Sequence, residues 1–485
     1  MTRLIVGPFN RVEGDLEVQL DIADGQVRTA KVNAPMFRGF EQILLGKLPM
    51  DALVYAPRIC GICSVSQSVA AARALEDATG VIAPLNGQLL TNLMLATENL
   101  ADHLTHFYLF FMPDFARAIY ASWAWHGTVH ERFAAQQGRH AKLALAARQR
   151  WFTLLGMLGG KWPHTQSIQP GGSSRAVDAS ERIRLLVKVR EFRSFLEQTL
   201  FGAPLEEVAA LDSEQALRDW HAGAPDAGDF RLFLSLSWAL GLDSMGPGPG
   251  LYMSNGAYPL SERGFRFAQG VWDAAAGTVS ELDTAAISED ATHAFLAADG
   301  RPRHPAEGVT LPEVDKPGAY TWNKAPRLNG RVLETGAIAR QMVDGHLLVR
   351  DAVARCGGVV YTRVLARLLE LALIVPAMEH WIQSVRIGEP CFSPSTLPSD
   401  VDGVGLTEAA RGSLGHWVSI REGRIANYQI VAPTSWNFSP RDASGTPGAL
   451  EAALVGAPVM TDEQTPVAVQ HIVRSFDPCM VCTVH

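Results

Sequence analysis

The chain has 485 residues, of which 47% are hydrophobic and 19% are charged, so it can bury a large core and is not an intrinsically disordered protein. Its net charge of -8 argues against nucleic acid as the main partner. The N-terminus has no charged segment followed by a long apolar stretch, which predicts a protein without a signal peptide, located in the cytoplasm.

The spacing of apolar residues predicts the elements in chain order. The first fifty residues are expected to be β-rich, because residues 16–21 alternate between apolar and polar side chains and residues 23–26 supply a turn. Helical spacing then predicts helices over residues 64–79, 89–112, 134–158, 179–200, 229–242 and 359–385. Gly80 is expected to end the first of these helices and Pro113 the second.

The rest of the chain is predicted to hold loops and one further hairpin. Residues 246–250 and 299–324 are expected to be irregular, and residues 417–431 to form a hairpin that turns near Gly423. Charged residues interrupt the apolar segment 359–385, which therefore predicts a buried helix rather than a membrane span. We expect a mostly α fold with small antiparallel β-hairpins near both chain ends.

Six cysteines in a chain of this length do not indicate a disulfide framework. Four of them form two C-x-x-C pairs, Cys60/Cys63 and Cys479/Cys482, which are typical of metal or redox sites. Spacing alone favours a structural zinc site. However, zinc ribbons keep their pairs close in sequence, whereas these pairs lie at opposite ends of the chain. Cys63 also leads into an apolar helix, and the second pair lies next to the terminus, which is normally at the surface.

One metal bound by both pairs would bring the two ends of the chain together. Metal–sulfur bonds of about 2.3 Å place the sulfurs within roughly 4 Å of each other. The helices in between must then surround this meeting point. Although length alone suggests roughly three domains, we therefore predict one interlocked helical-bundle domain over residues 1–485. Cys356 and Cys391 have no such partners and are predicted to be buried core residues.

The motifs around these cysteines are similar to those of a known family. Residues 58–63 (RICGIC) and 477–485 (DPCMVCTVH) resemble the two signatures of nickel–iron hydrogenase large subunits. Further segments that resemble family motifs, in the family's order, are 11–14 (RVEG), 37–41 (FRGFE), 163–164 (PH), 170–172 (PGG), 324–327 (KAPR), 408–412 (EAARG) and 433–437 (PTSWN). The resemblance covers the length of the chain, and the order of its motifs makes it specific.

The resemblance implies a hydrogenase that cleaves hydrogen heterolytically into protons and electrons. All four thiolates would bind nickel, with Cys60 and Cys479 as terminal ligands. Cys63 and Cys482 would bridge to an iron that carries carbon monoxide and two cyanides. Hydrogen is a weak ligand, so an electron-rich soft metal with an open position suits it.

The resemblance also implies roles for polar residues around the metals. Glu13 matches the family's proton-transfer glutamate, and burial near the metals is expected to raise the pKa of its carboxyl. By itself, Glu13 would be an ordinary glutamate on a hairpin face. Asp102, Arg411 and Asp477 match residues that overhang the metals, and a guanidinium between two carboxylates is satisfied even in a dry site. Alternatively, Arg411 has a structural role only and pairs with Asp102 to hold two segments of the chain together. Ala410 stands where family members usually have proline.

A second, hard metal is implied near the C-terminus. Glu41 and His485 match ligands of this ion, usually magnesium, with the backbone carbonyl near Ile430 as a third ligand and waters completing the octahedron. Without the resemblance, Glu41 would be an exposed carboxylate at a helix start and His485 a frayed terminus. Family precursors carry a tail that is cut after this histidine. The ending at His485 therefore predicts one of two cases. Either the tail has been removed, or no tail is encoded, as in the hydrogen-sensing members of the family.

A partner subunit is required, because no remaining cysteines can hold an iron–sulfur relay for the electrons. We expect an obligate heterodimer with an iron–sulfur small subunit, or a dimer of such heterodimers, with the iron–sulfur clusters only in that partner.

Departures from the family pattern predict an oxygen-tolerant, hydrogen-sensing (regulatory) member that signals to a sensor histidine kinase. Gln67 stands where the first motif normally has histidine, and glutamine takes up no proton at neutral pH. Ile62 and Phe110 are bulkier than the valine and leucine of oxygen-sensitive relatives and are expected to narrow the gas channel. The alternatives are an energy-conserving uptake hydrogenase, a structural zinc protein, and a quinone-reducing respiratory-complex subunit of the same fold, which lacks the nickel cysteines.

Overall fold

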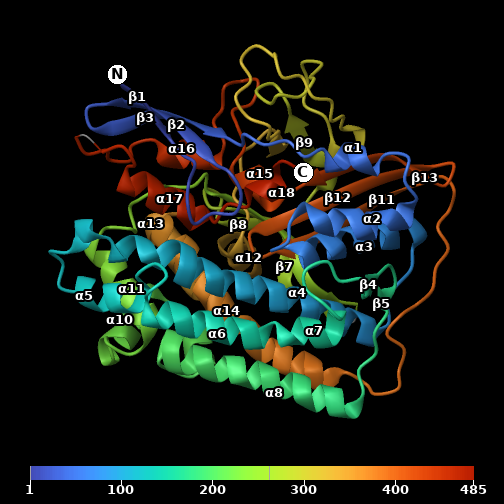
Figure 1. Ribbon diagram of the computed structural model, residues 1–485, viewed down its shortest axis with the longest axis horizontal. Coiled ribbons are helices and arrows are strands. Elements are labelled where there is room, and N and C mark those ends of the chain that lie inside the picture. Colours follow the sequence, from blue (N-terminus) through green and yellow to red (C-terminus); the bar gives the residue numbers. More distant parts are fainter. Residues whose placement is uncertain (1, 262, 462) are drawn as a thin grey trace.

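The computed structural model describes residues 2–261, 263–461 and 463–485, and its largest elements are helices (Figure 1). Long helices fill the lower half of this view, and small antiparallel sheets lie above and to the right of them. The described residues form three sheets of three strands and two of two strands, all antiparallel. The predicted mostly α fold with small β-hairpins is confirmed.

The N-terminal sheet contains β1 (Thr2–Val6), β2 (Glu17–Ala23) and β3 (Gln26–Asn33) in that order. Apolar residues of β2 alternate into the core as predicted, with Val18 and Leu20 fully buried. The β2–β3 turn lies at Asp24 and Gly25, both in the left-handed region that tight hairpin turns require.

Three long helices cross the centre of the molecule: α3 (Ser64–Thr79), α4 (Leu85–Thr105) and α14 (Val360–Ser384). Helix α3 has the predicted bounds and ends at Gly80, whose φ of 67° suits a left-handed cap. Helix α14 agrees with its prediction to within one residue at each end. It buries Arg363, Arg367 and Glu370, and no helix among the described residues is long and apolar enough to cross a membrane.

Helix α4 differs from its prediction at both ends. It begins after Pro84, four residues earlier than expected. After Thr105 the chain widens into a π-helical turn, His106–Phe111, and then tightens into a 3-10 turn, Met112–Ala116, which includes Pro113. Proline lacks an N–H and fixes φ, so it fits the start of this tight turn rather than an α-helix interior.

The helical stretch predicted over residues 134–158 is present, but it begins five residues later than expected and consists of two helices, α6 (Arg139–Trp151) and α7 (Thr153–Gly159). A further helix, α5 (His126–Phe133), precedes it and was not predicted. Between α5 and α6 the backbone is extended at Ala134 and left-handed at Gln136, with φ of 64°, so a helix cannot continue there.

The remaining helices are mostly short. In chain order they are α1 (Phe40–Leu44), α2 (Ala52–Tyr55), α8 (Ala179–Phe195), α9 (Leu205–Ala209), α10 (Glu214–Gly223), α11 (Gly228–Ala239), α12 (Ala337–Asp344), α13 (Leu347–Cys356), α15 (Pro433–Asn437), α16 (Ala449–Leu454), α17 (Val467–Phe476) and α18 (Met480–Thr483).

The C-terminal sheet consists of β11 (Val401–Ala409), β12 (Gly412–Arg421) and β13 (Arg424–Val431). Strands β12 and β13 are the predicted hairpin. Strand β11 was not predicted, because Gly403 and Gly405 obscure its alternation. The sheet of β6 (Leu251–Leu260), β7 (Gly264–Asp273) and β8 (Thr278–Ser280) was also missed. The two-stranded sheets pair β4 (Ile168–Gln169) with β5 (Gly172–Ser173), and β9 (Ile287–Asp290) with β10 (Ala325–Leu328).

The two ends of the chain meet at the centre of the molecule. Figure 1 shows β1–β3 beside the C-terminal helices α16 and α17, and the C-terminus inside the fold. The amide of Met480 donates to the carbonyl of Glu13 at 2.7 Å, and Glu13 forms a parallel bridge with Cys479. The predicted meeting of the two ends is therefore observed, while the single domain over residues 1–485 stays a prediction.

Candidate metal centre

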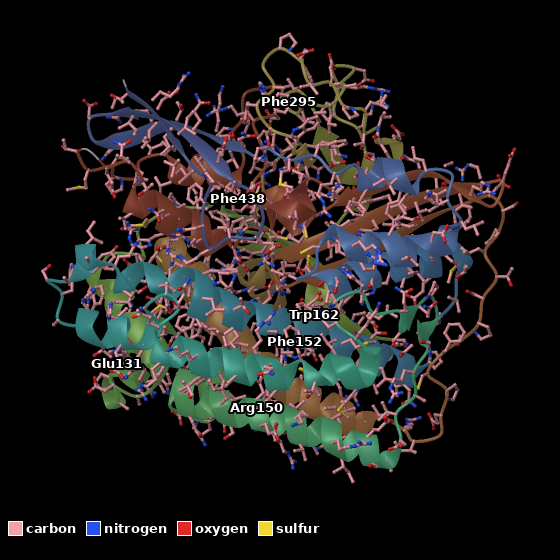
Figure 2. The ribbon with its side chains drawn as sticks, viewed as in Figure 1. Glu131, Arg150, Phe152, Trp162, Phe295 and Phe438 are labelled. Atoms are coloured by element: carbon pink, nitrogen blue, oxygen red, sulfur yellow. The ribbon has the colours of Figure 1, made fainter. Side chains whose placement is uncertain are left out.

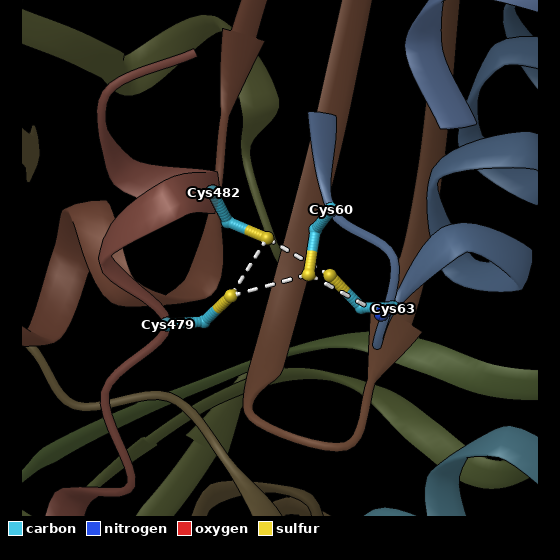
Figure 3. A group of neighbouring side chains, drawn as sticks. All are labelled: Cys60, Cys63, Cys479 and Cys482. Atoms are coloured by element: carbon cyan, nitrogen blue, oxygen red, sulfur yellow. Dashed lines mark hydrogen bonds between the residues drawn. The ribbon is translucent and has the colours of Figure 1, made fainter. Parts of the chain in front are cut away.

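Four cysteine sulfurs converge at this meeting point (Figure 3). Cys60 follows a 3-10 turn, Cys63 immediately precedes α3, Cys479 immediately precedes α18, and Cys482 lies within α18. The Sγ atoms of Cys60 and Cys479 are 3.5 Å apart, those of Cys63 and Cys482 are 2.8 Å apart, and those of Cys479 and Cys482 are 3.0 Å apart. All four lie within 4.8 Å of one another.

This donor set fits a single soft cation. The four side chains are at most 8% exposed, and the cysteines are free rather than disulfide-bonded. A metal with bonds of about 2.3 Å holds its sulfurs roughly 3–4 Å apart. Burial raises the pKa of Cys479 and Cys482, whereas hydrogen bonding from Cys479 lowers the pKa of Cys60. Buried thiolates need a cation for stability, and soft sulfur donors select soft metals.

Two N-terminal residues bring the cysteine loops together. Gly14 has φ of 79°, and a Cβ added to it would lie 3.0 Å from the backbone nitrogen of Val481, so only glycine allows this close approach. Arg38 donates to the carbonyls of Ile59, Arg58 (3.2 Å) and Val481 (3.5 Å). It therefore joins the loops that carry the first and second cysteine pairs.

Glu13 lies beside the cysteines, where the sequence analysis expected a proton acceptor. Its backbone is paired with the residues on either side of Cys479, and its side chain is half-buried. Burial raises the pKa of its carboxyl, and the nearby Cys60 sulfur raises it further, while Arg411 opposes both effects. A carboxyl in this position can exchange protons with the site.

The structure also brings together Asp102, Arg411 and Asp477, all buried. Arg411 forms an ion pair with Asp102 and donates to Asp477 at its carboxylate (3.2 Å) and its backbone carbonyl (2.9 Å). Burial raises the pKa of Asp102 to about 7. Burial acts in the same direction on Asp477, but Arg411 outweighs it, and the pKa of Asp477 is lowered. A fixed positive charge is thus held close to the sulfurs of Cys63 and Cys479.

Gln67 joins the cysteines to a histidine that the sequence analysis did not identify. Its amide nitrogen lies 3.9 Å from the Cys482 sulfur, and its carbonyl oxygen is 2.8 Å from Nε2 of His416. The Nδ1 of His416 is 2.8 Å from the Tyr428 hydroxyl. Burial lowers the pKa of His416 to about 3, so this histidine is neutral at physiological pH. A histidine facing inward on a β-strand was the only sequence signal for it.

Glu98 of α4 was also missed, although a carboxylate on an apolar helix is a usable signal. Its Oε2 accepts from the amide of Val65 (2.8 Å), Nε1 of Trp162 (3.1 Å) and the hydroxyl of Ser64 (3.4 Å). Its Oε1 accepts from the amide (2.9 Å) and hydroxyl (3.0 Å) of Ser66. Glu98 thereby caps the first turn of α3, directly after Cys63. The ring of Trp162 is held by stacking on Phe152, with centroids 4.4 Å apart (Figure 2).

Glu41 and His485 meet in a second buried cluster, at 2% and 6% exposure, rather than lying at the surface. Nε2 of His485 lies 3.1 Å from Glu41 Oε1, and the Ile430 amide donates to the same oxygen at 2.8 Å. The contact that the structure shows for Ile430 is thus through its N–H and not through its carbonyl. Burial acts to raise the pKa of Glu41, but the Lys324 ammonium, 3.7 Å away, and His485 lower it to about 2. No role was predicted for Lys324 from the sequence.

The structure places the other predicted residues as follows. Ile62 lies between Cys60 and Cys63, and Phe110 lies in the π-helical turn after α4; both are half-buried, and their predicted role in a gas channel stays a prediction. Cys391 is buried as expected, whereas Cys356 is only half-buried, at the last residue of α13. Among the described residues, the only group of three or more converging histidine, cysteine or acidic side chains is the set of four cysteines.

Comparisons with known proteins agree with this geometry. The family model described as nickel-dependent hydrogenase matches residues 38–136 and 240–485. The periplasmic NiFeSe hydrogenase large subunit of Desulfomicrobium baculatum is 31% identical over all of this chain and 95% of its own length. The uptake hydrogenase large subunit of Rubrivivax gelatinosus is 26% identical, with 100% and 95% covered. A solved structure of the H2-activated D. baculatum NiFeSe hydrogenase has a TM-score of 0.87 and 29% identity, and all of both chains is covered.

Proposed function

The chain belongs to the nickel-dependent hydrogenase family and is a hydrogenase large subunit, and on that premise we propose that it holds a nickel–iron centre, cleaves hydrogen heterolytically and acts as a hydrogen sensor. The observation that carries the proposal is the convergence of four buried sulfurs, from both ends of the chain, within 4.8 Å. The family match includes both cysteine pairs, which disfavours a structural zinc site and the respiratory-complex alternative.

The four cysteines would divide the metals between them. Cys60 and Cys479 would bind nickel alone, while Cys63 and Cys482 would bridge to an iron that carries carbon monoxide and two cyanides. When bound, this centre supplies an electron-rich, open coordination position at which hydrogen is polarised. The burial of all four sulfurs supports a metal centre of this kind, because it keeps water away from the site.

The surrounding side chains would manage charge and protons. Glu13 would accept the proton at its carboxylate and pass it outward, since its backbone is paired beside Cys479 and its side chain is only half-buried. Arg411, held by Asp102 and Asp477, would keep a fixed positive charge over the site without itself releasing a proton.

A second metal would be bound by Glu41 and His485, whose donor atoms lie 3.1 Å apart. A carboxylate oxygen and a hard cation such as Mg2+ suit each other, and waters with the backbone near Ile430 would complete the coordination. Lys324 would remain paired with Glu289, 2.8 Å away, when the cation is bound.

A small subunit with iron–sulfur clusters would take up the electrons. Among the described residues, the only group of cysteines placed to hold a metal is the one at the centre, which supports a partner that carries the electron relay. Two of the relatives are named as large subunits, which supports a heteromeric enzyme. We expect a heterodimer or a dimer of heterodimers.

The sensor role rests on the residues around the bridging thiolate. Gln67 and the neutral His416 place no ionisable charge next to Cys482. Ile62 and Phe110 would narrow the gas channel and exclude oxygen more than hydrogen. Such an enzyme would turn over slowly and signal to a histidine kinase in the cytoplasm. The second candidate is an energy-conserving uptake enzyme, which the uptake hydrogenase among the relatives favours.

Metal analysis tests the hydrogenase proposal. The purified complex should contain nickel, and its infrared spectrum should show carbon monoxide and cyanide stretches. Cys482→Ala should abolish both signals, because two metals lose a shared sulfur, whereas Cys391→Ala, a buried cysteine outside the site, should leave them in place. Zinc at one per chain without nickel would refute the proposal.

The sensor role needs separate experiments. Ile62→Val combined with Phe110→Leu should make hydrogen oxidation sensitive to air, if channel width protects the site. Deleting the gene should abolish hydrogen-dependent transcription, and fractionation should recover the protein in the cytoplasm. High turnover coupled to a membrane quinone pool would instead establish the uptake role.

A further inference from the structure

The residue that carries the positive charge over the cysteines, Arg411, lies on a two-residue turn. The turn is formed by Ala410 and Arg411 between β11 and β12, and Ala409 and Gly412 are the last pair of the ladder. A hairpin tip has few backbone partners of its own, so its position depends on what it packs against. In Figure 3 the strands of a β-hairpin run behind the cysteines, and its turn lies below them in the view.

The fully buried Arg340 of α12 contacts this turn through backbone carbonyls. Its Nη1 donates to the carbonyl of Ala409 at 2.8 Å, and its Nη2 donates to the carbonyl of Ala410 at 3.1 Å. Nη1 also donates to the carboxylate of Glu408 at 2.7 Å. One guanidinium therefore binds three consecutive residues that lead to Arg411.

The remaining donors of Arg340 bind Glu370 of α14. Nε lies 3.1 Å and Nη2 lies 2.9 Å and 3.0 Å from the oxygens of this carboxylate. All five N–H groups of the guanidinium then have acceptors, which is what a fully buried arginine needs. Glu370 therefore holds Arg340 to α14, a long helix in which both Glu370 and most of its neighbours are buried.

A close backbone approach holds the turn from a second direction. Gly412 has φ of 129°, and a Cβ added to it would lie 2.4 Å from Oγ1 of Thr335 and 2.5 Å from the nitrogen of Gly336. Gly336 is the residue that precedes α12. The start of the helix that carries Arg340 is thus pressed against the turn that Arg340 binds.

We propose that Arg340 is a positioning residue for hydrogen cleavage. By binding the Ala409 and Ala410 carbonyls, it fixes the position of the Arg411 guanidinium relative to the cysteines and the orientation of that group. The inference rests on the proposed function. Without these bonds the turn shifts, and the Arg411 guanidinium leaves its place between Asp102 and Asp477. A misplacement of about 1 Å in an active site lowers a rate by roughly 10²-fold.

The alternative is a purely structural ion cluster, and Arg327 provides the matched control. Arg327 of β10 is also buried and binds a carboxylate, Asp442, where Arg340 binds two. Like Arg340, it also donates to backbone carbonyls, but its hydrogen bonds reach neither the turn nor the cysteine loops. Arg340→Lys and Arg327→Lys each keep the charge and lose the planar fork of donors.

Three measurements on the purified complex separate the two accounts. Arg340→Lys should lower kcat by about 10–100-fold with little change in KM for hydrogen, and it should shift the carbon monoxide stretch in the infrared spectrum. It should also speed amide hydrogen exchange in residues 408–413, a readout that does not depend on metal loading. Arg327→Lys should lower the melting temperature by a similar amount but leave kcat, the carbon monoxide stretch and amide exchange in residues 408–413 unchanged.

A milder variant covers the case in which Arg340→Lys does not fold. Glu408→Gln keeps the side-chain volume and weakens the Arg340 contact, and it should produce the same infrared shift with a smaller loss of rate. Unchanged kcat, infrared bands and exchange in the folded variants would overturn the inference. Absence of carbon monoxide and cyanide bands in the wild type would instead overturn the proposed function, while the exchange result would still report on the turn.

Discussion

Glu98 provides the most direct test of how the fold positions Cys63, because four donors at the start of α3 and the indole N–H of Trp162 converge on its carboxylate. In Glu98→Gln one oxygen becomes an NH2 group. If this group faces Ser66, one buried amide N–H loses its acceptor; if it faces Val65 and Trp162, two N–H groups do. Each buried donor left without an acceptor costs about 1–3 kcal/mol, so the better orientation predicts a loss of about 2–4 kcal/mol, including the lost charge at the helix start.

The assay is thermal unfolding and nickel content of the purified complex at pH 8. Burial raises the pKa of Glu98 to about 7, so the carboxylate is ionised under these conditions. A chain of 485 residues loses about 1 kcal/mol per degree near its midpoint, which predicts a fall of about 2–4 °C together with lower nickel occupancy.

The matched control is Glu76→Gln at the other end of α3, since Glu76 accepts one hydrogen bond, from Gly171 at 2.9 Å, and glutamine can still accept it. This variant should change the midpoint by less than about 1 °C. If Glu98→Gln has the same midpoint of thermal unfolding and the same nickel content as this control, Glu98 does not stabilise the start of α3 as a cap.

Three further predictions follow from the site. Glu13→Gln should lower the rate of hydrogen oxidation by about 10²-fold or more with unchanged infrared bands, because the amide cannot take up the proton. A wild-type rate in this variant would show that Glu13 has no role in proton transfer. Glu41→Gln should reduce magnesium content measured by elemental analysis, and an unchanged content would remove Glu41 from the ligands. His416 has a pKa lowered to about 3 by burial, so it contributes stability above pH 6.5 that is lost as pH falls toward 3. Below pH 6.5 the free energy of unfolding should therefore fall less steeply with falling pH in His416→Gln than in the wild type, by up to about 1.4 kcal/mol per pH unit. Equal slopes in the variant and the wild type would contradict this.

Much of the helical framework could be predicted from the sequence, because long apolar periodicities end at residues with strong local preferences. Helix α3 ends at Gly80 as expected, and α14 keeps its predicted bounds within one residue. The predictions failed where tertiary contacts override periodicity. The helical stretch expected from residue 134 begins only at Arg139, because the backbone is extended at Ala134 and left-handed at Gln136, and β11 became visible as a strand only through its pairing with β12.

The site divides in the same way. The motifs identified the four cysteines, Glu13 and the Arg411 cluster, since each is a residue type with its own chemistry at a family position. Glu98, His416 and Arg340 were not identified. None of them belongs to a motif with a chemistry of its own, and their partners come from elements that are distant in sequence.

The sequence by itself determined the chemistry available to this protein: soft thiolate ligands in two pairs, a carboxylate next to them, and the resemblance to hydrogenases. Only the tertiary structure decided how these groups are held. The physical reason is that a metal ligand or a charge requires only a particular type of residue, and the residue types are given by the sequence itself. Its position requires acceptors for every buried donor, and these come from whichever segments the fold brings alongside. Arg340 shows this most clearly, because its five N–H groups are satisfied by α14 and by the β11–β12 turn, and neither is near it in the chain.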